Sequence, residues 1–443
     1  MKQWRYLIGS TVIAALGGLL FGFDTAVISG TVSSLESVFA LNEFWLGFTV
    51  AIALIGTILG SLSVGRPGDI YGRKQVLIVL AVFYTVSAIG SALARDWYLF
   101  LSFRFLGGLA VGGSSVMSPM YIAEISPAKI RGRLVAVQQF NIVFGILLAF
   151  LSNYLVASVV QQHAWRYMLG VEAIPAFLFF LLLFVIPRSP RWLVKTDRVD
   201  EARDVLGKTG EPDVERAIRD ILDSLKQKSD AAREKFFSKK YAVPIIAAVL
   251  LAFFNQMSGI NAILYYAPRI FEMTGLPMDA ALLQSVAVGM TNLVATIIAM
   301  VLIDRMGRKN LLLIGSVGMV LFLGLVAREF YLQDFGGYEV MFFLIGFIAF
   351  FAVSQGAVIW VFISEIFPNK VRAEGQALGT FTHWTMAAVV SWTFPVMADV
   401  IGGGHSFMIF ALMMVLQFIF VWKFIPETKG RSLEEIQREL GID

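Results

Sequence analysis

The sequence contains no cysteine among its 443 residues, and only 15% of its residues are charged. A chain without thiols forms neither a disulfide scaffold nor a cysteine-liganded zinc cluster, and it has no thiol redox chemistry. Soluble domains usually carry about a quarter charged residues, so this composition argues against a protein surrounded by water. No metal site is expected, because the three histidines lie too far apart in sequence to form a local motif: His163, His383 and His405.

Hydrophobic residues make up 57% of the chain, and the mean hydropathy is +0.73. This composition excludes intrinsic disorder and indicates an integral membrane protein. A hydrocarbon core of about 30 Å needs roughly 20 apolar residues per helix. Segments of that kind occur in two series of six. The first series is 6–30, 46–64, 76–93, 100–121, 134–156 and 167–187. The second series is 243–266, 282–302, 311–330, 340–362, 376–400 and 407–424.

Lysine and arginine are distributed unequally between the loops, and the cytoplasmic loops of membrane proteins carry the excess. Twelve spans place both termini on the same side of the membrane. That side then holds all but five of the 36 lysines and arginines. The exceptions are Arg104, within a span, and four residues in loops of the opposite side: Arg95, Arg166, Arg269 and Arg328. We therefore predict that both termini are cytoplasmic. These loops also explain the net charge of +4, so no nucleic-acid partner is expected.

Residues 188–241 form the only long polar stretch. They divide the chain into an N-terminal bundle (1–187), a cytoplasmic helical linker (188–241), a C-terminal bundle (242–425) and a cytoplasmic tail (426–443). Apolar residues recur in the linker at the spacing of one helix face: Val214, Ile218, Ile221, Leu222 and Leu225. We expect this amphipathic helix to pack beneath the membrane-spanning helices. A helix lying on the lipid surface is disfavoured, because acidic and basic residues are mixed along it.

Two short motifs occur twice, in the same order and at nearly the same separation. Asp-x-x-Gly-Arg-Lys begins at Asp69 and again at Asp304, 235 residues later. Glu-Ile-x-Pro-x-Lys-x-Arg begins at Glu124 and again at Glu365, 241 residues later. The agreement of the two offsets indicates a tandem duplication of a six-span unit. Two parallel halves of this kind are typical of secondary transporters whose site lies between them near the membrane midplane.

The duplicated loops place acids and arginines at the cytoplasmic ends of neighbouring helices. Charge-assisted bonds between them would clamp the cytoplasmic side while the site faces outward, and would break when it opens inward. The alternative is that these residues only anchor the loops on the positive side of the membrane. The predicted cytoplasmic gate comprises Asp69, Arg73, Glu124, Arg131, Asp304, Arg308, Glu365 and Arg372.

Four further stretches occur in order along the chain: FGFDTAVISG (21–30), PRSPRWL (187–193), QMSGIN (256–261) and PETKG (426–430). Together with the six-plus-six pattern they resemble the sugar porter family of the major facilitator superfamily, over essentially the whole chain. The resemblance implies an all-α membrane protein with 12 transmembrane helices in two pseudo-symmetric halves. It also implies transport of a monosaccharide, either a hexose or a pentose, such as glucose, xylose or galactose.

Asp24 lies deep in the first predicted span, and Arg104 is the one basic residue well inside another span of the same half. An ionisable group in hydrocarbon costs about 2.5–3.5 kcal/mol on insertion scales, so such a residue marks a transport pathway by default. Either the two residues form a structural ion pair, or Asp24 binds a proton and then releases Arg104. The resemblance implies proton coupling, because proton-coupled members have aspartate at this position and passive animal glucose carriers have asparagine.

An uncharged sugar needs amide and hydroxyl partners, with aromatic faces against its C–H groups. The seventh span supplies such polar groups at Asn255, Gln256, Asn261 and Tyr265. Gln256 and Asn261 share a cavity only if the helix is distorted, which Gly259 permits. The alternative is that these side chains hold helices together. The resemblance implies further substrate-binding or cavity-lining residues at Phe21, Gln139, Asn292, Phe351, Trp360, His383 and Trp384.

Departures from the family pattern occur at Asn255 (commonly glutamine), His383 (an amide), Ala357 (the proline of a Gly-Pro hinge) and Arg188 (an acid). Without the proline, we expect the tenth helix to bend less readily. His383 is expected to act either as a hydrogen-bond donor or as a second titrating group.

The sequence thus predicts a proton-driven monosaccharide symporter of a bacterial inner membrane that works by alternating access. The alternatives are a facilitative uniporter, in which Asp24 and Arg104 only gate, and more remotely a transporter-like sugar sensor. An enzyme is not expected, because the chain shows neither a glycine-rich phosphate loop before a helix nor a Ser–His–Asp or metal constellation. No cofactor besides the coupling proton is expected, and no obligate protein partner.

Overall fold

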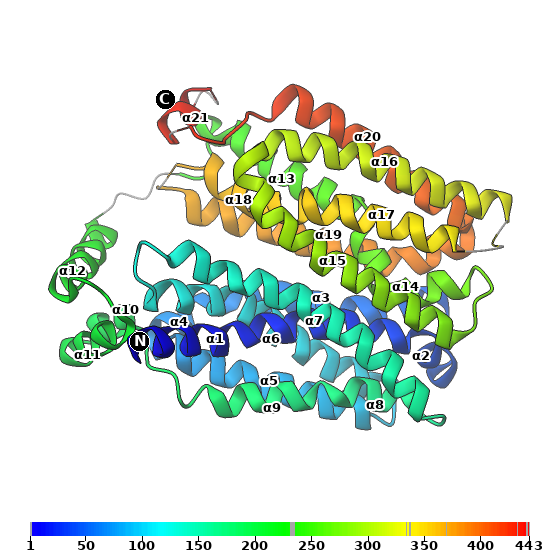
Figure 1. Cartoon of the computed structure of the whole chain (residues 1–443), viewed down its shortest axis with the longest axis horizontal. Helices are drawn as coiled ribbons and strands as arrows, with labels where there is room; N and C mark the ends of the chain where they lie inside the picture. The colour runs from blue at the N-terminus through cyan, green and yellow to red at the C-terminus, as the bar shows by residue number, and fades with distance from the viewer. Residues whose placement is uncertain are drawn as a thin grey trace. The chain divides into compact units, whose positions relative to one another are not determined.

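The structure is a computed structural model that describes residues 2–230, 235–333, 335, 338–368, 370–431, 433–439 and 442. Every regular element in these residues is a helix (Figure 1). The elements up to the linker are α1 (Lys2–Val27), the 3-10 helix η1 (Ile28–Thr31), α2 (Val32–Phe39), α3 (Glu43–Ser63), α4 (Gly65–Tyr71), α5 (Arg73–Leu93), α6 (Trp97–Ile125), α7 (Arg131–Val159), α8 (Ala164–Val171) and α9 (Ala173–Leu182).

The linker region holds α10 (Pro190–Lys195), α11 (Val199–Thr209), α12 (Val214–Asp230) and the 3-10 helix η2 (Lys239–Tyr241). The remaining helices are α13 (Ala242–Met257), α14 (Ile260–Glu272), α15 (Met278–Met306), α16 (Arg308–Leu332), α17 (Glu339–Val353), α18 (Gln355–Ile366), α19 (Arg372–Val400), α20 (Gly402–Phe424) and α21 (Leu433–Glu439).

Eleven helical stretches among the described residues are long and apolar enough to span a membrane. They coincide with the first to tenth predicted spans and with the twelfth. The eleventh predicted span is α19, a continuous helix of 29 residues. Its first turn carries Arg372 and Glu374, and His383 lies further along it, so it is more polar than its neighbours.

The first of two compact units comprises Met1–Val27, Ile55–Ser152 and Gln162–Ala232. Its core is an apolar cluster contributed mainly by α1, α5, α6 and α9, and it encloses the rings of Tyr84, Tyr121 and Phe179. The helices approach closely where small residues face a neighbouring backbone. A Cβ atom at Gly112 of α6, for example, would lie 2.0 Å from the carbonyl oxygen of Thr57 on α3. Such packing holds the polar residues of this unit in fixed positions.

The linker helices α10, α11 and α12 belong to the first unit. The predicted amphipathic helix is α12, and Ile221 and Leu225 of its apolar stripe pack against a small core that includes Trp192 and Val205. The stripe therefore faces α10 and α11, which themselves pack against α6. The amphipathic helix was predicted to pack directly beneath the membrane-spanning helices. Instead, α10 and α11 make that contact, and α12 packs on α10 and α11.

The second unit comprises Ile28–Leu54, Asn153–Gln161 and Arg233–Asp443. One of its spans is interrupted between α13 and α14 at Gly259, whose φ is +82°. Only glycine adopts this conformation freely, and a Cβ atom here would lie 2.5 Å from Cδ2 of Phe410. The sequence predicted a distortion at this glycine, and the structure confirms it.

A second interruption separates α17 from α18 at Ser354, where φ is −111° and ψ is −90°. No proline accompanies this break. Instead, Gln355 donates a hydrogen bond from Nε2 to Oε1 of Gln417 on α20, and Nε2 of Gln417 donates to Oγ of Ser316 on α16 at 3.0 Å. The expectation that this helix bends less readily without proline was wrong, because a buried chain of hydrogen bonds accompanies the break.

Candidate functional site

Asp24 and Arg104 form a buried ion pair inside the first unit. The last turn of α1 carries Asp24, and α6 carries Arg104. The guanidinium donates from Nη1 to Oδ1 at 2.5 Å and from Nη2 to Oδ2 at 3.3 Å, and the two residues are only 1% and 3% exposed. The pairing expected from two isolated charges in apolar spans is therefore present. A buried pair of this kind needs such fork-like geometry to offset its desolvation.

A third ionisable residue, Glu172, joins this pair and was missed in the sequence. It lies between α8 and α9, is 2% exposed, and interacts electrostatically with Asp24 and Arg104. The signal was available, since Glu172 is the one acid in the predicted span 167–187. The sequence reasoning looked only for a cationic partner of Asp24.

A cluster of amides in the second unit surrounds Gln256. Its Nε2 donates to Oδ1 of Asn255 at 2.9 Å, and its Oε1 accepts from Nδ2 of Asn261 at 2.8 Å. The break at Gly259 brings Gln256 and Asn261 together although five positions separate them. Nδ2 of Asn255 has no hydrogen-bond partner among the described residues. It is a buried donor available to a ligand.

The imidazole of His383 completes this cluster from α19. Nε2 of Gln256 lies 3.3 Å from Nδ1 and 3.2 Å from Nε2 of the ring. Since the amide nitrogen only donates, the ring nitrogen it bonds must be an unprotonated acceptor. The ring centroid of Trp360 lies 4.8 Å from that of His383, and the centroid of Trp384 lies 5.0 Å from it. The predicted residues thus form one group of amides beside two indoles.

The other predicted substrate residues lie on α1, α7, α14, α15 and α17. Tyr265 and Asn292 are buried on α14 and α15, and Phe351 stacks on Phe347 within α17. Phe21 and Gln139 are half-buried residues of the first unit. Their part in sugar binding stays a prediction.

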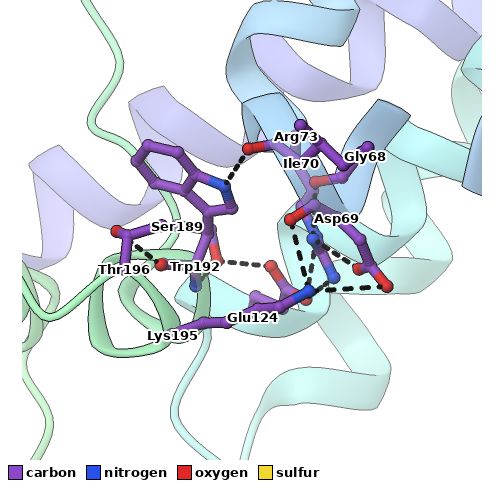
Figure 2. Close-up of polar contacts among 9 residues, drawn as sticks. All are labelled: Gly68, Asp69, Ile70, Arg73, Glu124, Ser189, Trp192, Lys195 and Thr196. Carbon is purple, nitrogen blue, oxygen red and sulfur yellow. Dashed lines mark hydrogen bonds and ion pairs between the residues drawn. The ribbon is translucent and has the colours of Figure 1, made fainter. Parts of the chain in front are cut away.

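In the first unit the duplicated loops form a connected ionic cluster (Figure 2). Arg73 is 5% exposed and bonds Oδ1 of Asp69 at 2.9 Å, Oε1 of Glu124 at 3.0 Å and the carbonyl oxygen of Gly68 at 2.6 Å. Ser189 donates to the other oxygen of Glu124 and caps α10. The indole of Trp192 donates to the carbonyl oxygen of Ile70 at 3.3 Å, so the linker is fastened to the loop.

The second unit repeats this arrangement. Nη2 of Arg308 lies 2.8 Å from Oε1 of Glu365, and Nη1 lies 3.7 Å from Oδ1 of Asp304. Thr428 donates to Glu365 at 2.6 Å, as Ser189 does to Glu124. Six of the eight predicted gate residues are therefore paired as expected. Residues that only anchored the loops on one side of the membrane would not need the same ion pairs in both halves.

Arg131 and Arg372 form no ion pair among the described residues. Arg131 lines a cavity of about 790 Å³ between the ends of α6 and α7 and the linker helices. Arg372 donates from Nε to the carbonyl oxygen of Phe367 at 3.4 Å. The prediction that these two arginines pair with the gate acids finds no support in this structure.

A family model described as "Sugar (and other) transporter" matches residues 10–440. The chain belongs to this family. It is 40% identical to the D-xylose-proton symporter of Escherichia coli, over 98% of this chain and 95% of the relative. It is 37% identical to the arabinose-proton symporter of Bacillus subtilis, over 98% and 95%.

Solved structures agree with these relatives. The xylose transporter of E. coli in an inward open conformation matches with a TM-score of 0.88 and 39% identity, over 98% of this chain and all of that chain. A related structure is described as a proton:xylose symporter of the major facilitator superfamily. The predicted family, the 12-span helical fold and the assignment as a multi-pass membrane transporter rather than an enzyme are confirmed.

Proposed function

We propose that the protein imports a monosaccharide together with a proton across a bacterial inner membrane by alternating access. The observation that carries this proposal is the arrangement of Asp24, Arg104 and Glu172. Asp24 pairs with Arg104, and the buried Glu172 interacts electrostatically with both. The group is therefore balanced when it holds one proton and carries excess negative charge when that proton leaves. The relatives that transport xylose and arabinose with protons support the same conclusion.

The sugar binds at the amide cluster around Gln256. Asn255 offers its free Nδ2 as a donor, Asn261 and His383 bond further hydroxyls, and the two indoles cover the C–H face of the ring. A pentose or hexose suits this mixture of neutral donors and acceptors, because no charged side chain takes part in the cluster's hydrogen bonds. We infer that no cofactor is needed besides the coupling proton.

We also infer the orientation of the chain. The helix ends that carry residues 69–74 and 304–309, which we call the motif-loop ends, face the cytoplasm. Both termini lie on this side, because it holds nearly all of the lysines and arginines. In this orientation a membrane potential of about 100 mV contributes about 2.3 kcal/mol to each inward-moving proton, enough for roughly fifty-fold accumulation.

The competing function is a facilitative uniporter, and the bidentate bond between Arg104 and Asp24 would also suit a purely structural pair. Proteoliposomes containing the wild type or Asp24→Asn separate the two functions. Labelled xylose, arabinose and glucose are added with and without an inward proton gradient. A symporter accumulates one of these sugars only with the gradient, and Asp24→Asn loses accumulation but keeps counterflow. Uptake that is indifferent to both the gradient and the substitution would establish a uniporter.

A further inference from the structure

A chain of buried hydrogen bonds joins three helices of the second unit beside the break at Ser354. Gln355, the first residue of α18, donates from Nε2 to Oε1 of Gln417 on α20. Nε2 of Gln417 donates to Oγ of Ser316 on α16 at 3.0 Å, and that hydroxyl donates to the carbonyl oxygen of Leu312 at 2.8 Å. The three side chains are buried, at 1%, 0% and 0% exposure. Hydrogen bonds in such a low-dielectric interior are strong, so this network fixes the helices that it joins.

The backbone of α16 lies directly against the break. A Cβ atom at Gly315 would lie 1.9 Å from Oγ of Ser354, so the glycine leaves the room that this serine occupies. Oγ of Ser354 in turn donates to the carbonyl oxygen of Phe350 at 2.6 Å. Since Gly315 immediately precedes Ser316, successive residues of α16 meet the break and the end of the hydrogen-bond chain. The network therefore acts at the break itself.

The first turn of α18 would accept a proline without losing a hydrogen bond. The N–H of Val358 donates to the carbonyl oxygen of Ser354 at 2.9 Å, whereas the N–H of Ala357 makes no backbone hydrogen bond to α17 among the described residues. The first N–H groups of a helix generally lack such partners, and proline is tolerated there. Its ring would also clash with the carbonyl group four residues earlier, that of Val353, and so disfavour a straight helix. Ala357→Pro is thus a second, independent way to hold the break.

The break separates two aromatic residues that the sequence predicted for the sugar site. Phe351 lies in the last turn of α17, and Trp360 lies on α18. The ring of Trp360 lies 4.8 Å from that of His383 on α19, and His383 bonds Gln256 at the centre of the amide cluster. The direction in which α18 leaves the break therefore sets the position of the Trp360 indole relative to the amides.

We propose that Gln417 and Ser316 are positioning residues for the sugar site, which hold α18 bent so that Trp360 lies against His383. Their hydrogen bonds lie outside the amide cluster, so they act through α18 and not by touching the sugar. This inference rests on the proposed sugar site. Sugar then binds only the molecules in which the break is formed, and the apparent affinity falls in proportion to their fraction. The alternative is that the network only ties helices together, which would change stability and leave affinity alone.

Equilibrium binding of labelled xylose, arabinose or glucose to the purified protein tests this role. Gln417→Met keeps the size of the side chain and removes two hydrogen bonds, each worth about fivefold in an equilibrium, so affinity should fall roughly tenfold or more. Ser316→Ala removes one bond and should lower affinity about fivefold. Adding Ala357→Pro to Gln417→Met should restore affinity to within about threefold of the wild type. Tyr121→Phe is the control, because it removes a buried bond in the first unit, to the carbonyl oxygen of Pro187, and should leave affinity unchanged.

A second readout does not depend on sugar. The chain has no cysteine of its own, so spin labels can be attached solely to Phe342→Cys on α17 and Ser364→Cys on α18. These positions are 22 residues apart, and a straight helix would separate their backbones by about 33 Å, a bent one by less. We expect Gln417→Met to lengthen the label distance and Ala357→Pro to restore it.

Unchanged affinity in Gln417→Met, or a label distance that stays the same, would refute the positioning role, as would a proline that restores neither. A wild type that binds none of the three sugars would contradict the proposed function instead, and the label distances would then decide by themselves whether Gln417 holds the break.

Discussion

The carboxylate of Glu427 accepts a hydrogen bond from the backbone N–H of Arg308 at 2.9 Å and thereby caps the first turn of α16. Its second oxygen accepts from the next N–H, that of Lys309, at 3.1 Å. Glu427 lies in Pro-Glu-Thr, and the matching Pro-Arg-Ser of the first half places Arg188 in the corresponding position. Arg188 cannot cap a helix start; its guanidinium lies 5.2 Å from the ring of Trp192 and adds positive charge near Lys74.

Arg188→Glu should therefore stabilise the protein. A carboxylate at this position can cap α5 as Glu427 caps α16, a contribution of about 0.5–2 kcal/mol. Thermal unfolding in detergent measures the change as a higher melting temperature. Arg188→Ala is the control, because it removes the positive charge without supplying a cap. Equal melting temperatures for the two variants would show that no cap forms.

Arg104→Met should destabilise the protein strongly. The substitution leaves Asp24 and Glu172 together without a cation, and breaking a buried ion pair from one side costs about 3–5 kcal/mol. The double variant Arg104→Met/Asp24→Asn should recover much of this loss, because it removes the uncompensated charge. A double variant as unstable as Arg104→Met would contradict the charge argument and point to lost packing of the long arginine side chain.

Gly259→Ala should disrupt sugar binding, and Gly275→Ala should not. Both glycines have positive φ, +82° and +86°, so alanine pays about 1–2 kcal/mol of backbone strain at either position. Only at Gly259 does the added Cβ atom also meet a neighbour, the ring of Phe410. The clash displaces the interruption between α13 and α14, which brings the side chains of Gln256 and Asn261 together. Sugar affinity, measured by equilibrium binding of labelled sugar to the purified protein, distinguishes the two variants.

His383→Gln should keep sugar binding, and His383→Leu should weaken it. The amide oxygen of glutamine can accept from Nε2 of Gln256 in place of the imidazole nitrogen, whereas leucine leaves that donor without its partner. An unsatisfied buried donor costs about 1–3 kcal/mol, so affinity should fall roughly tenfold. If the leucine variant binds sugar as tightly as the wild type, the Gln256–His383 bond is not part of the site.

Much of this architecture could be predicted because its signals are local in the sequence. Apolar runs predicted the spans, because charged residues are excluded from the hydrocarbon region and lie in the loops. The repeated loop motifs predicted the two halves. Gly259 could be identified because two amides five positions apart cannot face the same side of a regular helix. The packing of α12 on α10 and α11 could not be predicted, because an apolar stripe shows that a helix face is buried but not which element covers it.

The polar network was only partly predictable. Asp24 and Arg104 stood out as single charges in apolar segments, and Glu172 would have stood out by the same criterion. Tyr84 on α5 and Ser114 on α6, whose hydroxyl oxygens lie 2.8 Å apart, give no such signal, because tyrosine and serine are ordinary residues of membrane helices and only the facing of the two helices makes them a pair. Arg131 shows the opposite error, since a residue within a repeated motif need not share its neighbours' ion pairs.

The break at Ser354 differs in kind from one imposed by a proline ring. A proline removes a backbone donor permanently, so the kink persists in every state of the helix. At Ser354 the backbone keeps all its donors, and hydrogen bonds such as that from Gln355 to Gln417 hold the break. Each such hydrogen bond contributes a net free energy on the order of 1 kcal/mol to stability. The break in the tenth span thus depends on side-chain contacts between helices, whereas a proline kink belongs to the chain itself.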